Sequence, residues 1–191
     1  MALDVPEPVR ARLAELSARM KKVCPNARWV RLEGVHITLK FIGEKKAEAV
    51  EDIKRVLSEI HGSAFEISFR GHGFFPTAKA ARVFWIGIQA GPDLAKLAGA
   101  VDEATHQLGI PKEEHAFSPH LTLARGGGRS GAPGWRKADG ANKNFGVLQE
   151  KLAAMPAPEF GTMTAREFFL YESQLMRGGS RYTKIARFAL A

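Results

Sequence analysis

The sequence contains a single cysteine, Cys24, among its 191 residues. One thiol excludes an intrachain disulfide and any zinc site built from several cysteines, and it favours a reducing, cytoplasmic setting. We expect Cys24 to be buried as a small apolar residue beside the end of a helix, because no neighbouring residue marks its thiol as activated.

Long apolar runs are also missing. No stretch approaches the roughly 18 consecutive apolar residues that a transmembrane helix needs. The N-terminal segment carries Asp4, Pro6, Glu7 and Glu15, where a signal peptide would need an apolar centre. We therefore expect no membrane association and a protein that stays in the cytoplasm.

Acidic residues are the scarcer charged type, since 20 Asp and Glu against 28 Lys and Arg give a formal net charge of +8. This excess favours a polyanionic partner such as RNA, or a phosphorylated ligand. Composition does not choose between these, and a basic protein need not bind nucleic acid at all. With 45% hydrophobic residues, the chain can bury a substantial core as one medium domain or two small lobes.

Two short segments share the pattern His-x-Thr-Leu, at residues 36–39 and 120–123. Each is predicted to be a strand, in which alternate side chains point to opposite faces. His36 and Thr38 would then share one face, and His120 and Thr122 would share one face of the second strand. The repeat predicts two halves of one site, facing each other across a cleft.

The rest of the chain predicts an α+β fold. Apolar residues at helical spacing predict helices from residue 7 to Pro25 and over 50–60, 92–108 and 147–155. Strands are expected over 1–5, 27–33, 35–42, 65–69, 82–89 and 120–123, with a closing hairpin from 164–175 and 181–190. We expect a turn at 71–76 and a flexible glycine-rich loop at 126–146.

Paired histidines suit metal-free phosphoryl chemistry. One imidazole can remove a proton from the attacking oxygen while the other protonates the departing oxygen, and each transfer is typically worth roughly 10² to 10⁴ in rate. The hydroxyls of Thr38 and Thr122 can donate to phosphoryl oxygens as negative charge develops there. A single histidine in a strand is more often structural, so it is the repeat of the pattern that indicates catalysis.

Other roles remain open at this stage. Two histidines could ligate zinc or iron, but a third protein ligand is missing from both segments and threonine is a poor one. Arg125 is either a phosphate-binding fork or an exposed loop arginine. Lys40 is predicted on the face of His36, or as a strand-end lysine in solvent. His115, just before the second motif, is a further candidate to line the site.

With these residues in view, the chain resembles the two-histidine (2H) phosphoesterase superfamily, and within it the RNA 2′,3′-cyclic phosphodiesterases also called 2′-5′ RNA ligases. The segments that carry the resemblance are 2–6, 36–43, 75–76, 82–85, 117–125 and 171–175, with Gly179 and Tyr182. It implies two pseudo-symmetric lobes of antiparallel sheet, with helices outside, around a central cleft and without metal or cofactor.

The resemblance also implies a role for each site residue. His36 would protonate the leaving 3′ oxygen, His120 would activate water, Thr38 and Thr122 would hold the phosphate, and Arg125 matches an arginine that follows the second motif. The expected substrate is RNA or an oligonucleotide with a 2′,3′-cyclic phosphate end, opened to a 2′-phosphate, with 2′-5′ ligation as a side activity.

We expect residues 1–191 to form a single 2H phosphoesterase domain, with the chain crossing between its lobes, and to act as a monomer. Two alternatives are a 2H phosphodiesterase for other cyclic or 2′-5′ linked nucleotides and a non-catalytic RNA-binding module. Three aromatic residues, Phe41, Phe75 and Trp85, could stack on a base, although aromatic residues in strands usually belong to the core.

Overall fold

The computed structural model describes residues 1–126, 143–176 and 179–191. Its helices are α1 (Glu7–Val23), α2 (Ala49–Ser58), α3 (Pro92–His106) and α4 (Lys143–Ala153), with a short 3₁₀ helix η1 (Leu32–Gly34). Its strands are β1 (Ala2–Asp4), β2 (Arg28–Trp29), β3 (His36–Thr38), β4 (Phe65–Phe75), β5 (Val83–Ala90), β6 (His120–Arg125), β7 (Glu159–Ala165), β8 (Glu167–Met176) and β9 (Gly179–Ala189).

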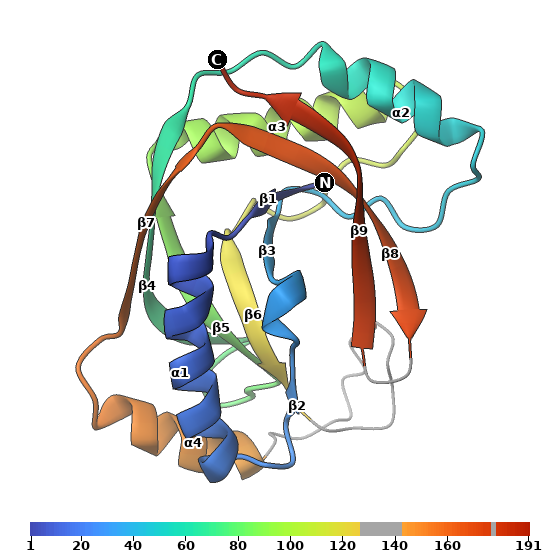
Figure 1. The fold of residues 1–191 in the computed structure, drawn as a ribbon. Helices are drawn as coiled ribbons and strands as arrows, with labels where there is room; N and C mark the ends of the chain where they lie inside the picture. The colour runs from blue at the N-terminus through green and yellow to red at the C-terminus, as the bar shows by residue number, and fades with distance from the viewer. Residues whose placement is uncertain (127–142, 177–178) are drawn as a thin grey trace.

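The strands form two antiparallel sheets, which confirms the predicted α+β class. A four-stranded sheet has the order β3-β1-β8-β9, and a five-stranded sheet has the order β2-β6-β5-β4-β7. Helix α1 contacts helix α4 and also strand β7, which belongs to the five-stranded sheet. Helix α2 contacts helix α3 and also strand β9, which belongs to the four-stranded sheet (Figure 1). Each sheet therefore has its own pair of helices, as expected for two similar lobes.

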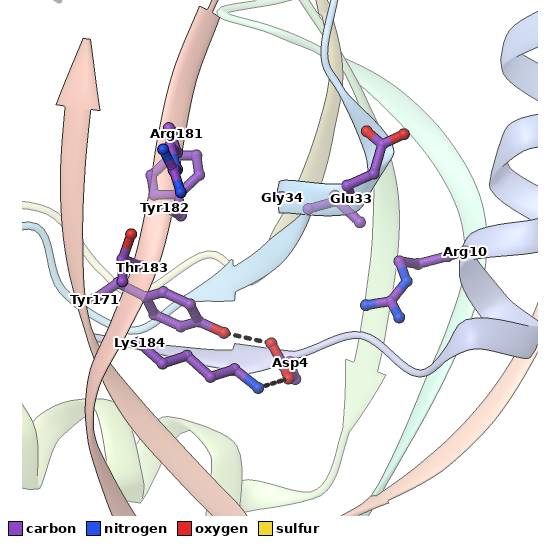
Figure 2. A pocket seen from close by; sticks show the side chains of 10 residues that line it. Asp4, Arg10, Glu33, Gly34, Tyr171, Arg181, Tyr182, Thr183 and Lys184 are labelled. Carbon is purple, nitrogen blue, oxygen red and sulfur yellow. Dashed lines mark hydrogen bonds and ion pairs between the residues drawn. The ribbon is translucent and has the colours of Figure 1, made fainter. Parts of the chain in front are cut away.

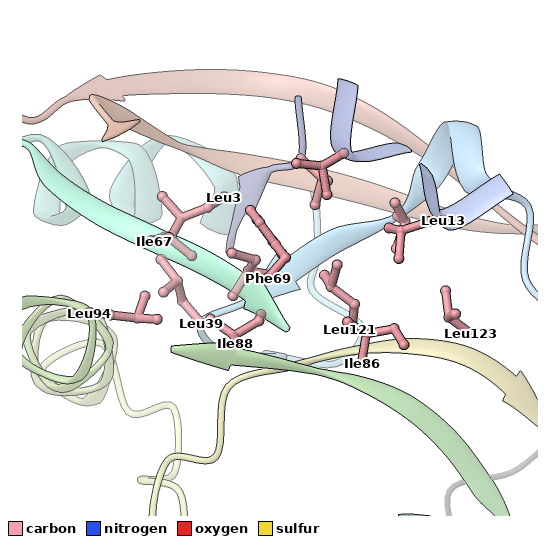
Figure 3. Packing of buried hydrophobic residues seen from close by; sticks show 14 of the residues in the cluster. Leu3, Leu13, Leu39, Ile67, Phe69, Ile86, Ile88, Leu94, Leu121 and Leu123 are labelled. Carbon is pink, nitrogen blue, oxygen red and sulfur yellow. The ribbon is translucent and has the colours of Figure 1, made fainter. Parts of the chain in front are cut away.

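One continuous apolar cluster joins both sheets and the helices. Leu3 of β1, Leu13 of α1 and Leu121 of β6 are all fully buried in it (Figure 3). Cys24 is 1% exposed at the end of α1, so its predicted burial as a small apolar residue is confirmed, and this burial raises the pKa of its thiol. Within the described ranges, no helix is long and apolar enough to cross a membrane.

The turn predicted at residues 71–76 is wrong, because β4 continues through this segment to Phe75. Gly73 lies opposite Trp85 of β5, and a Cβ at this position would collide with the Trp85 ring. Gly71 has a φ of 72°, at a point where the register between β4 and β5 shifts. The glycines thus permit close packing and a bulge within a long strand.

Several predicted boundaries also change. The strand expected over 35–42 is limited to His36–Thr38, and the strand expected over 27–33 becomes β2 followed by η1. Residues 164–175 do not form one strand, since β7 ends at Ala165 and β8 begins at Glu167. Helix α4 starts at Lys143, inside the loop predicted at 126–146. Residues 127–142 of that loop lie outside the described part of the chain.

Candidate active site

His36 and His120 occupy equivalent places, because each is the first residue of its strand. The strands β3 and β6 belong to different sheets but lie against each other (Figure 1). The segment leading into β3 is tied to β6 by a hydrogen bond of 2.9 Å from the Val30 amide to the Leu123 carbonyl. The fold thus brings together two strands that are far apart in the sequence.

Both imidazoles are held by the same backbone contact. The Nδ1 atom of His36 lies 2.8 Å from the Gly34 carbonyl oxygen, and that of His120 lies 2.8 Å from the Ser118 carbonyl oxygen. A carbonyl oxygen only accepts, so Nδ1 carries the proton and donates in both cases. Nε2 is then the atom of each ring that can gain or lose a proton, which is the requirement for an acid–base pair.

The aromatic surroundings of the two rings differ. The His36 ring is stacked on Tyr171, with centroids 5.5 Å apart, and meets Tyr182 edge-on at 4.6 Å. His120 meets Phe75 edge-on at 4.9 Å and lies 6.3 Å from Trp85. Two of the three predicted base-stacking residues, Phe75 and Trp85, therefore support His120.

Burial lowers the pKa of His36 below its ordinary value of 6.5, because the charged imidazolium loses hydration there. The hydrogen bond to the Gly34 carbonyl opposes this shift, as does the carboxylate of Asp4, which is paired with His36 across the β1–β3 ladder. The positive N-terminal amine adds to the lowering. His36 is therefore neutral over a wider pH range than a free histidine.

The two threonines lie where strand alternation predicts. Thr38 is exposed and sits two residues after His36, while Thr122 is half-buried, two residues after His120 and opposite Trp85. Both hydroxyls are thus on the histidine side of their strands. This position suits them to donate to the oxygens of a bound phosphate.

Arg125 reaches the exposed side of β6 through an irregularity in the strand. Simple alternation over the five residues from His120 to Arg125 would put the two side chains on different faces of the strand. The register between β5 and β6 shifts at this point, and two successive residues, Leu123 and Ala124, are both buried. Such a bulge reverses the alternation, and Arg125 is exposed at the end of the strand.

The prediction that Lys40 either lies on the face of His36 or reaches solvent is wrong. The Lys40 side chain is 2% exposed, and its Nζ lies 2.5 Å from Asp102 Oδ1 and 2.8 Å from the Pro111 carbonyl oxygen. Strand β3 ends at Thr38, and the amides of Leu39 and Lys40 both donate to the Met1 carbonyl. This irregularity turns Lys40 toward α3, so it contributes to stability and not to the cleft.

Phe41 is the third predicted base-stacking residue, and it is 71% exposed just after β3. Phe41 follows Thr38 closely in the sequence, and its exposed ring is available to a ligand. His115 is exposed in the loop before β6. In the residues that the structure describes, no group of three His, Cys, Asp or Glu side chains is placed to hold a metal ion, and metal independence stays a prediction.

The sequence interpretation gave no role to the residues around His36. The chain has only two tyrosines, Tyr171 and Tyr182, and both contact this ring. The Tyr171 hydroxyl and the Lys184 ammonium both donate to the Asp4 carboxylate (Figure 2). Burial and this carboxylate raise the pKa of Tyr171, so its hydroxyl stays protonated. The family resemblance had already pointed to segments 2–6 and 171–175 and to Tyr182, although without a role for them.

A pocket of about 510 Å³ opens beside His36, next to these tyrosines. Its lining comes from β1, α1, η1, β8 and β9: Asp4, Arg10, Glu33, Gly34, Val35, Tyr171, Arg181, Tyr182, Thr183 and Lys184 (Figure 2). The pocket thus brings residues from both ends of the chain to the neighbourhood of one catalytic candidate.

Comparison with known proteins gives a consistent match. Residues 3–85 match the family described as LigT like Phosphoesterase. The chain is 31% identical over 188 residues to an RNA 2′,3′-cyclic phosphodiesterase of Archaeoglobus fulgidus, covering 98% of this chain and 97% of that protein. It is 34% identical over 186 residues to a protein of the same name from Aquifex aeolicus, covering 92% and 90% of the two chains.

Solved structures match over the same length. The crystal structure of E. coli LigT complexed with 3′-AMP superposes with a TM-score of 0.76 at 26% identity, covering 99% of this chain and 95% of that one. The structure of TT0787 of Thermus thermophilus has a TM-score of 0.74 at 27% identity, with 99% and 95% coverage. The two-sheet arrangement is therefore shared along the whole chain.

Proposed function

Because the chain belongs to the LigT-like phosphoesterase family, we propose that it is an RNA 2′,3′-cyclic phosphodiesterase that opens terminal cyclic phosphates to 2′-phosphates. One observation carries the proposal beyond family membership. Two histidines begin neighbouring strands of different sheets, and both are held through Nδ1 by a backbone carbonyl, so both present Nε2 for proton transfer.

In the proposed reaction, His120 and His36 act in sequence on one phosphorus atom. Nε2 of His120 takes a proton from water, and the water oxygen forms a bond to phosphorus. The bond from phosphorus to O3′ breaks, and Nε2 of His36 gives its proton to that oxygen. The product keeps the phosphate on O2′, and a proton moved from His120 back to His36 restores the enzyme.

Thr38, Thr122 and Arg125 are proposed to hold the phosphate during this step. The hydroxyls donate to its non-bridging oxygens, and the guanidinium binds two of them as a fork. The exposed ring of Phe41, three residues after Thr38, is proposed to offer a surface for the terminal base. An RNA 5′ hydroxyl in place of the attacking water would give a 2′-5′ linkage, which is the ligation expected as a side activity.

The partner is RNA or an oligonucleotide with a cyclic phosphate end, for which the net charge of +8 provides attraction. We propose that the enzyme works as a monomer in the cytoplasm. Light scattering after gel filtration checks the first statement, and fractionation of cells that express the natural gene checks the second.

Hydrolysis of an oligonucleotide with a 2′,3′-cyclic phosphate end tests the mechanism. His36→Ala and His120→Ala are each expected to lower kcat by about 10² to 10⁴, because each removes one proton transfer. Excess EDTA is expected to leave the wild-type rate unchanged. Full activity in either variant, or complete loss with the chelator, would contradict the two-histidine mechanism. Phosphorus NMR should identify a 2′-phosphate, whereas a 3′-phosphate would reverse the leaving-group assignment.

A further inference from the structure

We propose that the pocket beside His36 binds the nucleotide on the 5′ side of the terminal cyclic phosphate, so that the enzyme prefers RNA ends to free cyclic mononucleotides. This inference rests on the proposed function and extends it to the choice of substrate. The pocket has a volume of about 510 Å³, within the roughly 300 to 1,000 Å³ of ligand pockets.

The pocket lies on the same face of the sheet as the catalytic histidine. Asp4 is paired with His36 across β1 and β3, and Tyr171 is paired with Lys184 across β8 and β9. The ring contacts of His36 with Tyr171 and Tyr182 join these pairs into one surface. A substrate whose phosphate lies at His36 can therefore reach this surface with the nucleotide that precedes its terminal nucleoside.

Two arginines give the pocket its positive charge. Arg181 on β9 is exposed, and no described residue forms an ion pair or hydrogen bond with it. Arg10 projects from α1 into the pocket, where its only ion-pair partner in the described chain is the exposed Glu7 (Figure 2). Lys184, in contrast, is neutralised by Asp4. Arg181 is thus available to a backbone phosphate, and Arg10 can join it by exchanging its exposed Glu7 partner for the phosphate.

The remaining lining favours a nucleotide over free phosphate. Tyr182 is 38% exposed and offers aromatic surface for stacking. Glu33, on η1, belongs to the lining of the same pocket. A carboxylate repels inorganic phosphate but accepts hydrogen bonds from the amino groups of bases. Because a cyclic end occupies both O2′ and O3′, the RNA chain can continue only through the 5′ phosphate.

The test compares kcat/KM for a nucleoside 2′,3′-cyclic phosphate and for a tetranucleotide with the same terminal nucleoside. Wild-type enzyme is expected to prefer the tetranucleotide. Arg181→Gln and Arg10→Gln should each lower kcat/KM about tenfold for the tetranucleotide and less than twofold for the mononucleotide. Arg187→Gln is the matched control, since it removes the same charge from β9 outside the pocket, where Arg187 pairs with Glu167. It should change neither value.

If Arg181→Gln and Arg10→Gln lower kcat/KM equally for both substrates, the proposal is overturned, because the pocket would then hold the terminal nucleoside itself. Unchanged rates in both arginine variants would also overturn it. If wild-type enzyme opens neither substrate, the proposed function fails. A binding measurement then tests separately whether the pocket holds RNA. Fluorescence anisotropy with a labelled tetranucleotide 2′-phosphate should then show weaker binding to Arg181→Gln than to Arg187→Gln, and equal affinities would reject the pocket.

Discussion

His36 and His120 have the same backbone anchor but different surroundings, so their titration is expected to affect the reaction differently. As the proposed acid, His36 must be protonated in the active enzyme. Burial lowers its pKa in the free enzyme, which moves the alkaline limb of kcat/KM to lower pH. The negative charge of a bound phosphate favours the imidazolium, so the alkaline limb of kcat should lie at higher pH than that of kcat/KM.

Measured pH profiles of kcat and kcat/KM check whether the alkaline limb of kcat lies at the higher pH. Variants of each histidine then show which residue causes the acid limb and which the alkaline limb. The residual activity of His36→Asn should lose the alkaline limb and keep the acid limb, whereas His120→Asn should show the reverse. If His36→Asn instead loses the acid limb, then His36 is the base, and the roles of the two histidines must be exchanged.

At the scale of elements, the ion pair of Lys40 and Asp102 joins the end of β3 to α3. Lys40→Ala removes a buried ammonium with two hydrogen-bond partners and leaves Asp102, which is 21% exposed in the wild type, without this ion pair. We expect the free energy of unfolding to fall by about 2 to 3 kcal/mol. The kcat of the folded variant should stay within a few-fold of wild type, because Lys40 lies outside the site.

Urea denaturation measures this loss, and Lys96→Ala is the control. Lys96 pairs with Asp93 on the surface of α3, where an exposed pair contributes at most about 1 kcal/mol. The hydrogen bond from Lys40 lowers the pKa of Asp102 below 3.8. The contribution of the pair is therefore complete above pH 3.8 and is lost as the pH falls through the lowered value. Equal stability of the two variants would argue against this link.

The elements also show what the sequence could predict. Helices were placed well, because apolar residues at helical spacing in α1, α2 and α3 do face the core. The His-x-Thr repeat correctly identified two strands. The position of Gly73 within a strand, where a turn was predicted, could not be foreseen, since it depends on Trp85 of a neighbouring strand. The same holds for Arg125, because the register between β5 and β6 determines on which face of β6 it lies.

At the scale of the whole molecule, the order of strands predicts a single unfolding unit. The four-stranded sheet combines β1 and β3 from the start of the chain with β8 and β9 from its end. Neither half of the sequence can complete this sheet alone, and one apolar cluster joins both sheets. Urea unfolding followed by tryptophan fluorescence and by circular dichroism should therefore give coincident midpoints. Two separated transitions would show that the lobes are independent domains.

The anchoring of both imidazoles by main-chain oxygens has a consequence for how the site tolerates mutation. Every residue carries a carbonyl, so Ser118 can be exchanged for other side chains without losing the acceptor for His120. Gly34 provides the same acceptor for His36, although the nearby Tyr182 ring restricts its replacements. Genetic drift at these positions should therefore preserve the orientation of the rings, and selection on proton transfer should fall mainly on the two histidines themselves.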